Sequence, residues 1–277
     1  MAPALRDSKR HKVVKCTNCG LVQISPTPAA ASDKRFYDEG RQASNIGTPT
    51  NIKQLRTEQD VDTRRRTKFV SDLLKTGAEI LDVGTGYGFF LEAMKRKNFK
   101  VTGLEISKAA RIIAKKVTRA EILNVNILRE NPERKFDAVT AFHVLEHVTD
   151  PVEMLRRLFH LLKKNGKLII EVPNLEDWML SNSAYSQFYW QRAHISYFNQ
   201  AILLKILKKA GLKNFNFFFE QRYGLLNAMN WVINHKPQIG SPSFFAPKNL
   251  LWLENIYKKA AVENKLSDTL LLVILKN

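Results

Sequence analysis

The stretch EILDVGTGYGFFLEAM, residues 79–94, joins an apolar run to an amphipathic run through three alternating glycines. The run EILDVG has the length and aliphatic content of a buried strand, and GFFLEAM carries apolar residues at helical spacing. Glycine between a strand and a helix permits positive φ and lets a ligand come close to the backbone. The N–H groups at the start of the helix then face that ligand. The stretch therefore predicts a ligand site at the first strand-to-helix turn.

Strands and helices alternate through the rest of the chain, which is typical of a parallel sheet with right-handed crossovers. We expect strands at residues 100–107, 120–126, 136–142, 167–174, 213–224 and 267–277. We expect helices at residues 51–77, 88–98, 107–117, 150–166 and 199–212. About forty residues before the last strand are rich in Leu, Trp, Phe and Pro, and long insertions of this kind often cover a site.

The details of the first turn favour an adenosyl sulfonium over a dinucleotide. The spacing is G-x-G-x-G, not the G-x-G-x-x-G of a pyrophosphate-binding turn. Asp82 precedes the glycines and would oppose a pyrophosphate but suit an ammonium or sulfonium group. Glu105 ends the second strand about twenty residues further on, where a carboxylate accepts the hydroxyls of a ribose. The structural alternative is that the glycines only permit tight packing and that Asp82 is a cap.

Four motifs in order carry a family resemblance: EILDVGTGYG, VTGLEIS, FDAVTAFHVLEHVTDP and NGKLIIEVPN. Together they resemble the class I S-adenosylmethionine (SAM)-dependent methyltransferases, in the small-molecule branch with an HVLEHV motif. The resemblance covers about residues 77–215 and the closing strand near residue 270. It implies an α/β fold with a Rossmann-like, doubly wound, mostly parallel seven-stranded sheet and a final antiparallel strand. A helical N-terminal extension and a C-terminal insertion complete the expected architecture.

The resemblance also implies a cofactor site for SAM. Glu105 would hold the ribose, Ile106 and Ile127 would flank the adenine, and Asn126 would meet the adenine amine. Thr85 departs from the family, which often has Cys or Ala there, but it is small enough to leave the turn intact. The full predicted cofactor-binding set is Asp82, Gly84, Thr85, Gly86, Gly88, Glu105, Ile106, Asn126, Ile127 and His143.

Candidate catalytic residues follow the fourth and fifth strands. An oxygen or carbon acceptor must lose a proton, usually to a positioned His, Glu or Asp. His143, Glu146 and His147 lie in HVLEHV, and His194 lies in the H-x-x-x-F segment that the family places near the acceptor. Glu146 and His147 could instead brace the loop, and His194 could be a structural hydrogen-bonding residue. The four could also gather around a divalent cation, but we predict no metal because the HVLEHV form generally lacks one.

The pair Cys16 and Cys19 has the C-x-x-C shape of a zinc knuckle, followed by GLVQISPTP. Several relatives carry a ribbon with two such pairs, and this sequence matches its second half. Four ligands are needed and no second pair is present. Although His11 could supply a third, we expect no tightly bound zinc. Tyr185, Tyr189 and Trp190 could shape a substrate pocket or belong to the core.

Composition limits the remaining possibilities. The net charge is +18 over 277 residues, spread along the chain, with TRRRTK and MKRKNFK as the densest basic spots. We interpret this charge as solvated faces rather than a nucleic-acid groove. The polar N-terminus and the lack of a long apolar run predict a cytoplasmic protein without a transmembrane segment, with peripheral membrane contact possible. Residues 1–76 are expected to form an extension, and residues 77–277 the methyltransferase domain with a lid or insertion at about 222–264.

We therefore predict a SAM-dependent methyltransferase that acts on O or C of a small-molecule acceptor: a sugar, a lipid-like compound or an aromatic metabolite. An RNA methyltransferase is the first alternative, and a SAM-binding or scaffold protein without catalysis is the second. The sequence fixes neither the acceptor nor the oligomeric state, because fold does not determine function.

Overall fold

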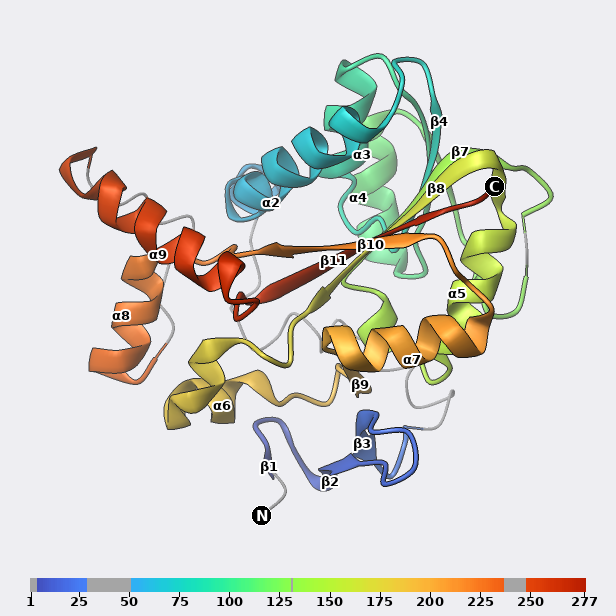
Figure 1. Ribbon diagram of the computed structural model, residues 1–277. Helices are drawn as coiled ribbons and strands as arrows, with labels where there is room; N and C mark the ends of the chain where they lie inside the picture. The colour runs from blue at the N-terminus through green and yellow to red at the C-terminus, as the bar shows by residue number, and fades with distance from the viewer. Residues whose placement is uncertain (1–3, 29–50, 131, 237–247) are drawn as a thin grey trace.

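The computed structural model describes residues 4–28, 51–130, 132–236 and 248–277. A seven-stranded sheet with strand order β10-β11-β8-β7-β4-β5-β6 forms its centre (Figure 1). β4 pairs in parallel with β5 and β7, and β11 runs antiparallel to both of its neighbours. The predicted sheet is confirmed, including its final antiparallel strand. The bounds are β4 Glu79–Val83, β5 Lys100–Leu104, β6 Glu121–Leu123, β7 Phe136–Phe142, β8 Leu162–Pro173, β10 Phe215–Glu220 and β11 Thr269–Leu275.

Helices cover both faces of this sheet, as Figure 1 shows. On one face lie α2 (Ile52–Leu73), α3 (Phe89–Arg96) and α4 (Lys108–Thr118), which bury apolar side chains such as Leu91 and Met94. On the other face, α5 (Pro151–His160) and α7 (Gln200–Ala210) pack into a larger core. Because the crossovers place helices on both sides, the carboxyl ends of β4, β5 and β7 meet at one edge, where open α/β sheets bind ligands.

Two predicted helices end earlier than expected. α2 ends at Leu73, before Gly77. α5 ends at His160, and residues 162–166 already belong to β8, so the prediction of a helix to Gly166 is wrong at that end. Leu161 and Leu162 are buried apolar residues that suit either a helix or a strand, and Leu162 pairs with Phe136 of β7.

The N-terminal segment forms a small sheet of its own. β1 (Ala4–Leu5), β2 (Ser8–Lys15) and β3 (Val22–Ser25) pair in sequence, and β3 also pairs with β9 (Ser196–Tyr197). This sheet packs on an aromatic cluster with α6 (Ser183–Tyr189), and Tyr185, Tyr189 and Trp190 are buried there. The core interpretation of these three aromatic residues therefore fits the structure. The residues FYDEG at positions 36–40, which the resemblance to the ribbon of the relatives also includes, lie outside the described residues.

The predicted insertion contains two helices, α8 (Leu225–Asn234) and α9 (Leu251–Glu263), which project beyond the ends of β10 and β11 (Figure 1). Three short 3-10 turns complete the described elements: Leu145–His147, Trp178–Ser181 and Lys248–Leu250. Across the described ranges, no helix combines the length and the apolar character needed to cross a bilayer. The division of the chain at residue 76 stays a prediction.

Candidate functional site

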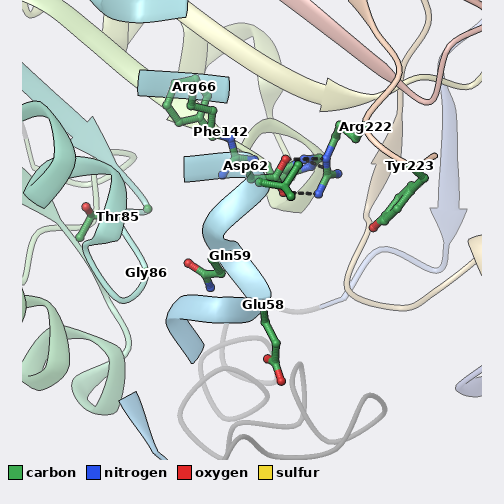
Figure 2. Close-up of a pocket in the computed structure, with 12 residues that line it drawn as sticks. Glu58, Gln59, Asp62, Arg66, Thr85, Gly86, Phe142, Arg222 and Tyr223 are labelled. Atoms are coloured by element: carbon green, nitrogen blue, oxygen red, sulfur yellow. Dashed lines mark hydrogen bonds and ion pairs between the residues drawn. The ribbon is translucent and has the colours of Figure 1, made fainter. Parts of the chain in front are cut away.

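A cavity of about 370 Å³ lies at the carboxyl ends of β4 and β7. Figure 2 shows a turn of α2 between the glycine turn on one side and the segment after β10 on the other. This volume is in the range of small-molecule sites. The lining residues are Glu58, Gln59, Val61, Asp62, Arg66, Gly84, Thr85, Gly86, Phe142, His143, Arg222 and Tyr223.

The three glycines of the turn are needed for different reasons. Gly84, Gly86 and Gly88 have φ values of 72°, 56° and 81°, a region that disfavours other residues. A Cβ at Gly84 would lie 2.5 Å from Cγ2 of Val144, and one at Gly88 would lie 2.8 Å from Cγ2 of Thr118. A Cβ added at Gly86 would have no other atom within 4 Å. The protein itself therefore crowds two of the glycines, and the space at Gly86 is open.

Glu105 shapes this turn from the end of β5. Its carboxylate accepts a 2.8 Å hydrogen bond from the N–H of Gly86 and another of 2.8 Å from the N–H of Ser107. Burial raises the pKa of Glu105 despite these hydrogen bonds. Each carboxylate oxygen keeps a further lone pair, so Glu105 is still able to accept from a ribose hydroxyl. The predicted ribose role is thus compatible with the geometry and stays a prediction.

Asp82 lies beneath the turn rather than on the cavity wall. Its side chain is 3% exposed and accepts a 2.6 Å hydrogen bond from the hydroxyl of Thr140. Burial raises the pKa of Asp82 to about 6. The carboxylate thus lies inside the sheet beside the cavity, and its predicted role toward an ammonium or sulfonium group stays a prediction.

The predicted adenine contacts do not line the cavity. Ile106 is 47% exposed beside the turn, whereas Ile127 is buried in the main core. Asn126 is exposed, and its side-chain oxygen accepts from the N–H of Leu128. Their roles stay predictions.

A buried carboxylate on β8, Glu171, binds the arginines of α2 on the cavity wall opposite the glycine turn. The side chain of Glu171 is fully buried, and Arg65 binds it through two hydrogen bonds of 2.8 and 2.9 Å. Arg66 adds two more, of 2.6 and 3.1 Å. Burial acts to raise the pKa of Glu171, but the charges of Arg66 and Arg65 hold it well below the usual range. Helix α2 is thereby fixed to the end of the sheet.

A second ion pair joins α2 to the segment after β10. Asp62 accepts from both Arg65 and Arg222, and the dashed lines of Figure 2 mark its contacts with Arg222. Burial opposes ionisation of Asp62, but the charges of Arg222, Arg66 and Arg65 lower its pKa. The interpretation of TRRRTK as a solvated face is wrong for Arg65 and Arg66, whose guanidinium groups bind the buried Glu171. A glutamate inside the apolar run KLIIEVPN was an available signal, because lone buried charges are rare.

His143 connects this charged group to the HVLEHV segment. Its backbone has a φ of 54°, and its Nδ1 lies 2.9 Å from an oxygen of Glu146. Its Nε2 lies 3.1 Å from Glu171 and 3.0 Å from Nη1 of Arg222. Burial and Arg222 lower the pKa of His143, but hydrogen bonds to Glu146 and Glu171 outweigh them and raise it overall. Of the four predicted catalytic residues, His143 alone is among the cavity-lining residues.

The other three gather behind His143. Glu146 is 1% exposed, and despite burial its contacts with His143 lower its pKa to about 2. Nδ1 of His147 lies 2.6 Å from the carbonyl oxygen of Ala193. The ring of His194 stands edge-on to His147 at 5.1 Å, and burial together with His147 lowers the pKa of His194 to about 3. This placement fits the bracing interpretation, with Glu146 orienting His143 and the two histidines supporting the loop.

Two groups of residues bear on metal binding. Potential ligand atoms of Glu146, His147 and His194 lie within 4.8 Å of one another, and these residue types suit transition metals. The predicted absence of a metal is therefore not tested and stays a prediction. Cys16 and Cys19 lie in the β2–β3 turn, and in the described parts of the chain they have no third ligand group around them.

Comparison with known proteins identifies the family. A family model described as "Methyltransferase domain" matches residues 55–216, which is more than half of the chain. The chain belongs to this methyltransferase family. The predicted class, a SAM-dependent methyltransferase of class I, is confirmed by this match and by the fold. The match begins inside α2, the helix that carries Asp62, Arg65 and Arg66.

Curated relatives and solved structures agree with the assignment. The ubiquinone biosynthesis O-methyltransferase of Alkalilimnicola ehrlichii is 37% identical over 105 residues, or 35% of this chain and 42% of that protein. The enzyme of the same name from Coxiella burnetii is 35% identical over 105 residues, or 35% of this chain and 44% of that protein. The match thus spans less than half the length of these relatives.

Solved methyltransferases share the fold at low sequence identity. A SAM-dependent methyltransferase from Archaeoglobus fulgidus has a TM-score of 0.55 at 18% identity, over 79% of this chain and 94% of that one. The magnesium protoporphyrin IX methyltransferase from Synechocystis, solved with bound S-adenosylhomocysteine (SAH), has a TM-score of 0.56 at 14% identity, over 90% of this chain and 100% of that one.

The methyltransferase cavity has features that fit a SAM molecule. The open position at Gly86 leaves room for a ligand against the backbone. Thr85 lines the same wall, and its buried hydroxyl lies beside Asp82, where it acts to lower the pKa that burial raises. Arg66 and His143 line the opposite wall. The predicted residues Gly84, Thr85, Gly86 and His143 are therefore brought together around one space.

We predict that Gly86→Ala will reduce SAM affinity at least about tenfold while leaving the protein folded. The new methyl group would project into the open position, and its positive φ would cost about 1–2 kcal/mol of stability. Gly77→Ala is the matched control, because Gly77 has a φ of 86° and open space but lies away from the cavity. Calorimetric titration with SAM measures affinity, and urea unfolding measures stability. Equal affinities of the two variants would contradict a ligand at Gly86.

We predict that Glu171→Ala will destabilise the protein by about 3–5 kcal/mol, because it leaves buried arginines without their partner. Asp60→Ala removes the exposed partner of Arg64 and should cost no more than about 1 kcal/mol. Urea unfolding of both variants tests the difference. A loss below about 1 kcal/mol for Glu171→Ala would show that α2 is held by other contacts.

Proposed function

We propose that the protein transfers the methyl group of SAM to an oxygen atom of a small-molecule acceptor. The observation that carries this proposal is the cavity in which the glycine turn faces Arg66, His143 and Tyr223. The names of the curated relatives, which are O-methyltransferases, favour oxygen over carbon as the acceptor atom. The preferred acceptor is a compound with a hydroxyl group that this cavity can enclose.

The first part of the proposal concerns the cofactor. Bound SAM supplies an electrophilic methyl group on a sulfonium. Gly84, Thr85 and Gly86 would hold its amino-acid end, and Glu105 would accept from its ribose. Ile106, Asn126 and Ile127 would contact the adenine, as the family resemblance implies. Helix α2 covers the site through Gln59 and Asp62, which limits access of water to the reacting atoms.

The second part concerns the acceptor proton. His143 is held from one side by Glu146, and its Nε2 lies at the cavity. In the proposal, a neutral His143 takes the hydroxyl proton at Nε2 after the acceptor displaces Nη1 of Arg222. The resulting imidazolium would be stabilised by Glu171, 3.1 Å away. A raised pKa suits such a base at neutral pH. His147 and His194 would support the loop without contacting the acceptor.

The RNA alternative has no specific structural observation in its favour. Two of the three arginines in TRRRTK bind Glu171, so their charge is already matched inside the protein. The exposed Arg64 pairs with Asp60. Small-molecule transfer is therefore the better-supported proposal, with RNA as an outcome of the test.

The test combines binding and transfer. We expect calorimetry to detect SAM binding, with a dissociation constant between about 1 μM and 1 mM. We also expect isotope-labelled methyl groups to appear on hydroxylated acceptors from a panel of phenols, catechols and sugars. Glu105→Ala should weaken SAM binding about tenfold or more, because hydrogen bonds to a charged group are worth about 1.5–3 kcal/mol.

Glu121→Ala is the control for this experiment, since Glu121 is an exposed glutamate on the neighbouring strand β6. It should leave SAM affinity unchanged. An absence of binding heat with SAM would contradict both the enzyme and the cofactor-binding proposals. Transfer to RNA but to no small acceptor would favour the alternative. Binding without any transfer across both panels would favour a non-catalytic protein.

A further inference from the structure

Helices α8 and α9 expose an unusual number of large apolar side chains. On α8, Met229, Val232 and Ile233 are 40%, 43% and 65% exposed, and their spacing places them on one face. The other face of α8 is buried through Ala228 and Trp231. Exposed apolar clusters of this kind mark interaction surfaces.

Helix α9 repeats this arrangement. Trp252 and Ile256 are 60% and 56% exposed and lie one turn apart, and Leu251 beside them is 41% exposed. Glu254 and Ala261 of the same helix are buried. The two helices lie together at the end of the molecule beyond β10 and β11 (Figure 1). We call the exposed faces of Met229, Val232, Ile233, Leu251, Trp252 and Ile256 the apolar edge.

Lysines lie just outside both helices of the apolar edge. Lys236 follows α8 directly after its left-handed cap His235, and Lys248 begins the 3-10 turn that precedes α9. Neither makes an ion pair with a described residue. Lys259 continues the α9 face and is 74% exposed, with Glu263 at 3.7 Å. Lysines at the margins of an apolar face can keep their ammonium groups in water or near phosphates while the stems lie on apolar surface.

We propose that the apolar edge binds the surface of an anionic lipid bilayer. Tryptophan and aliphatic residues beside lysines are the composition of segments that lie in the membrane interface. Pairing with a second copy would bring two such lysine-flanked faces together in a protein of net charge +18, whereas anionic headgroups would offset that charge. Arg222 and Tyr223 line the cavity and precede α8, so this helix connects one wall of the cavity to the apolar edge along the chain.

The test uses the purified full chain and extruded vesicles, and it does not depend on methyl transfer. We expect the protein to sediment with vesicles containing about 30% phosphatidylglycerol in phosphatidylcholine, and much less with phosphatidylcholine alone. Trp252→Glu combined with Ile256→Glu should reduce partitioning at least about tenfold, because two charged side chains would replace two apolar ones at the membrane interface. Lys236→Glu with Lys248→Glu should reduce binding to the anionic vesicles specifically.

Ile112→Glu is the matched control, since Ile112 on α4 is 60% exposed and lies outside the apolar edge. It should bind vesicles like the natural protein. A second readout is fluorescence. Of the four tryptophans, Trp190 and Trp231 are buried, Trp178 is half-buried and Trp252 is exposed, so a blue shift on binding should come mainly from Trp252 and should be lost in Trp252→Phe while binding persists.

Three results would overturn the proposal. The first is no sedimentation with anionic vesicles. The second is equal loss, or no loss, of binding in the α9 variant and the Ile112 control, which would assign binding to the general basic charge. The third is a dimer, seen by light scattering, that the α9 variant converts to a monomer, which would make a second copy the occupant of this surface.

Discussion

The ionised carboxylate of Glu171 is the constraint on which the site depends. A charge this deeply buried is stable only when opposite charges and hydrogen bonds surround it. Arg65, Arg66 and His143 supply them from two separate segments of the chain. Since both arginines come from α2, the same interaction holds that helix across the carboxyl end of the sheet. Glu58, Gln59 and Asp62 line the cavity because α2 is fixed there.

The glycine turn provides the complementary wall. Its shape is set from inside the protein, because Val144 crowds Gly84 and Thr118 crowds Gly88. The hydrogen bond from Gly86 to Glu105 then fixes the middle of the turn against β5. The result is a turn whose backbone from Gly84 to Gly86 lines the cavity. A single carboxylate thus holds the turn against β5, and in the proposal the same carboxylate accepts from the ribose.

Sequence reasoning predicted the sheet well because its signals are local. The run at residues 136–142 and the glycine turn each carry their pattern within a few neighbouring residues. The charged network was missed because its partners are far apart: Arg65 and Glu171 are separated by 106 positions. A run of arginines does not reveal which one faces inward until the partner is placed. Glu171 itself, a charge within an apolar strand, was the clue that pattern reasoning could have used.

The position of the end of α5 was also beyond local reasoning. Leu161 and Leu162 satisfy helical and strand patterns equally, and the pairing of Leu162 with Phe136 decides between them. The same limit applies to HVLEHV. The motif places His143, Glu146 and His147 close together in sequence, but only the fold turns His143 toward the cavity, Glu146 toward His143 and His147 toward Ala193.

The most direct test of the account is a crystal structure of the protein with SAH. The account predicts the amino-acid end of the ligand against Thr85 and Gly86, the ribose at Glu105, and the sulfur facing the space bounded by His143 and Tyr223. A ligand bound elsewhere, or a glycine turn that stays empty at saturating SAH, would contradict it.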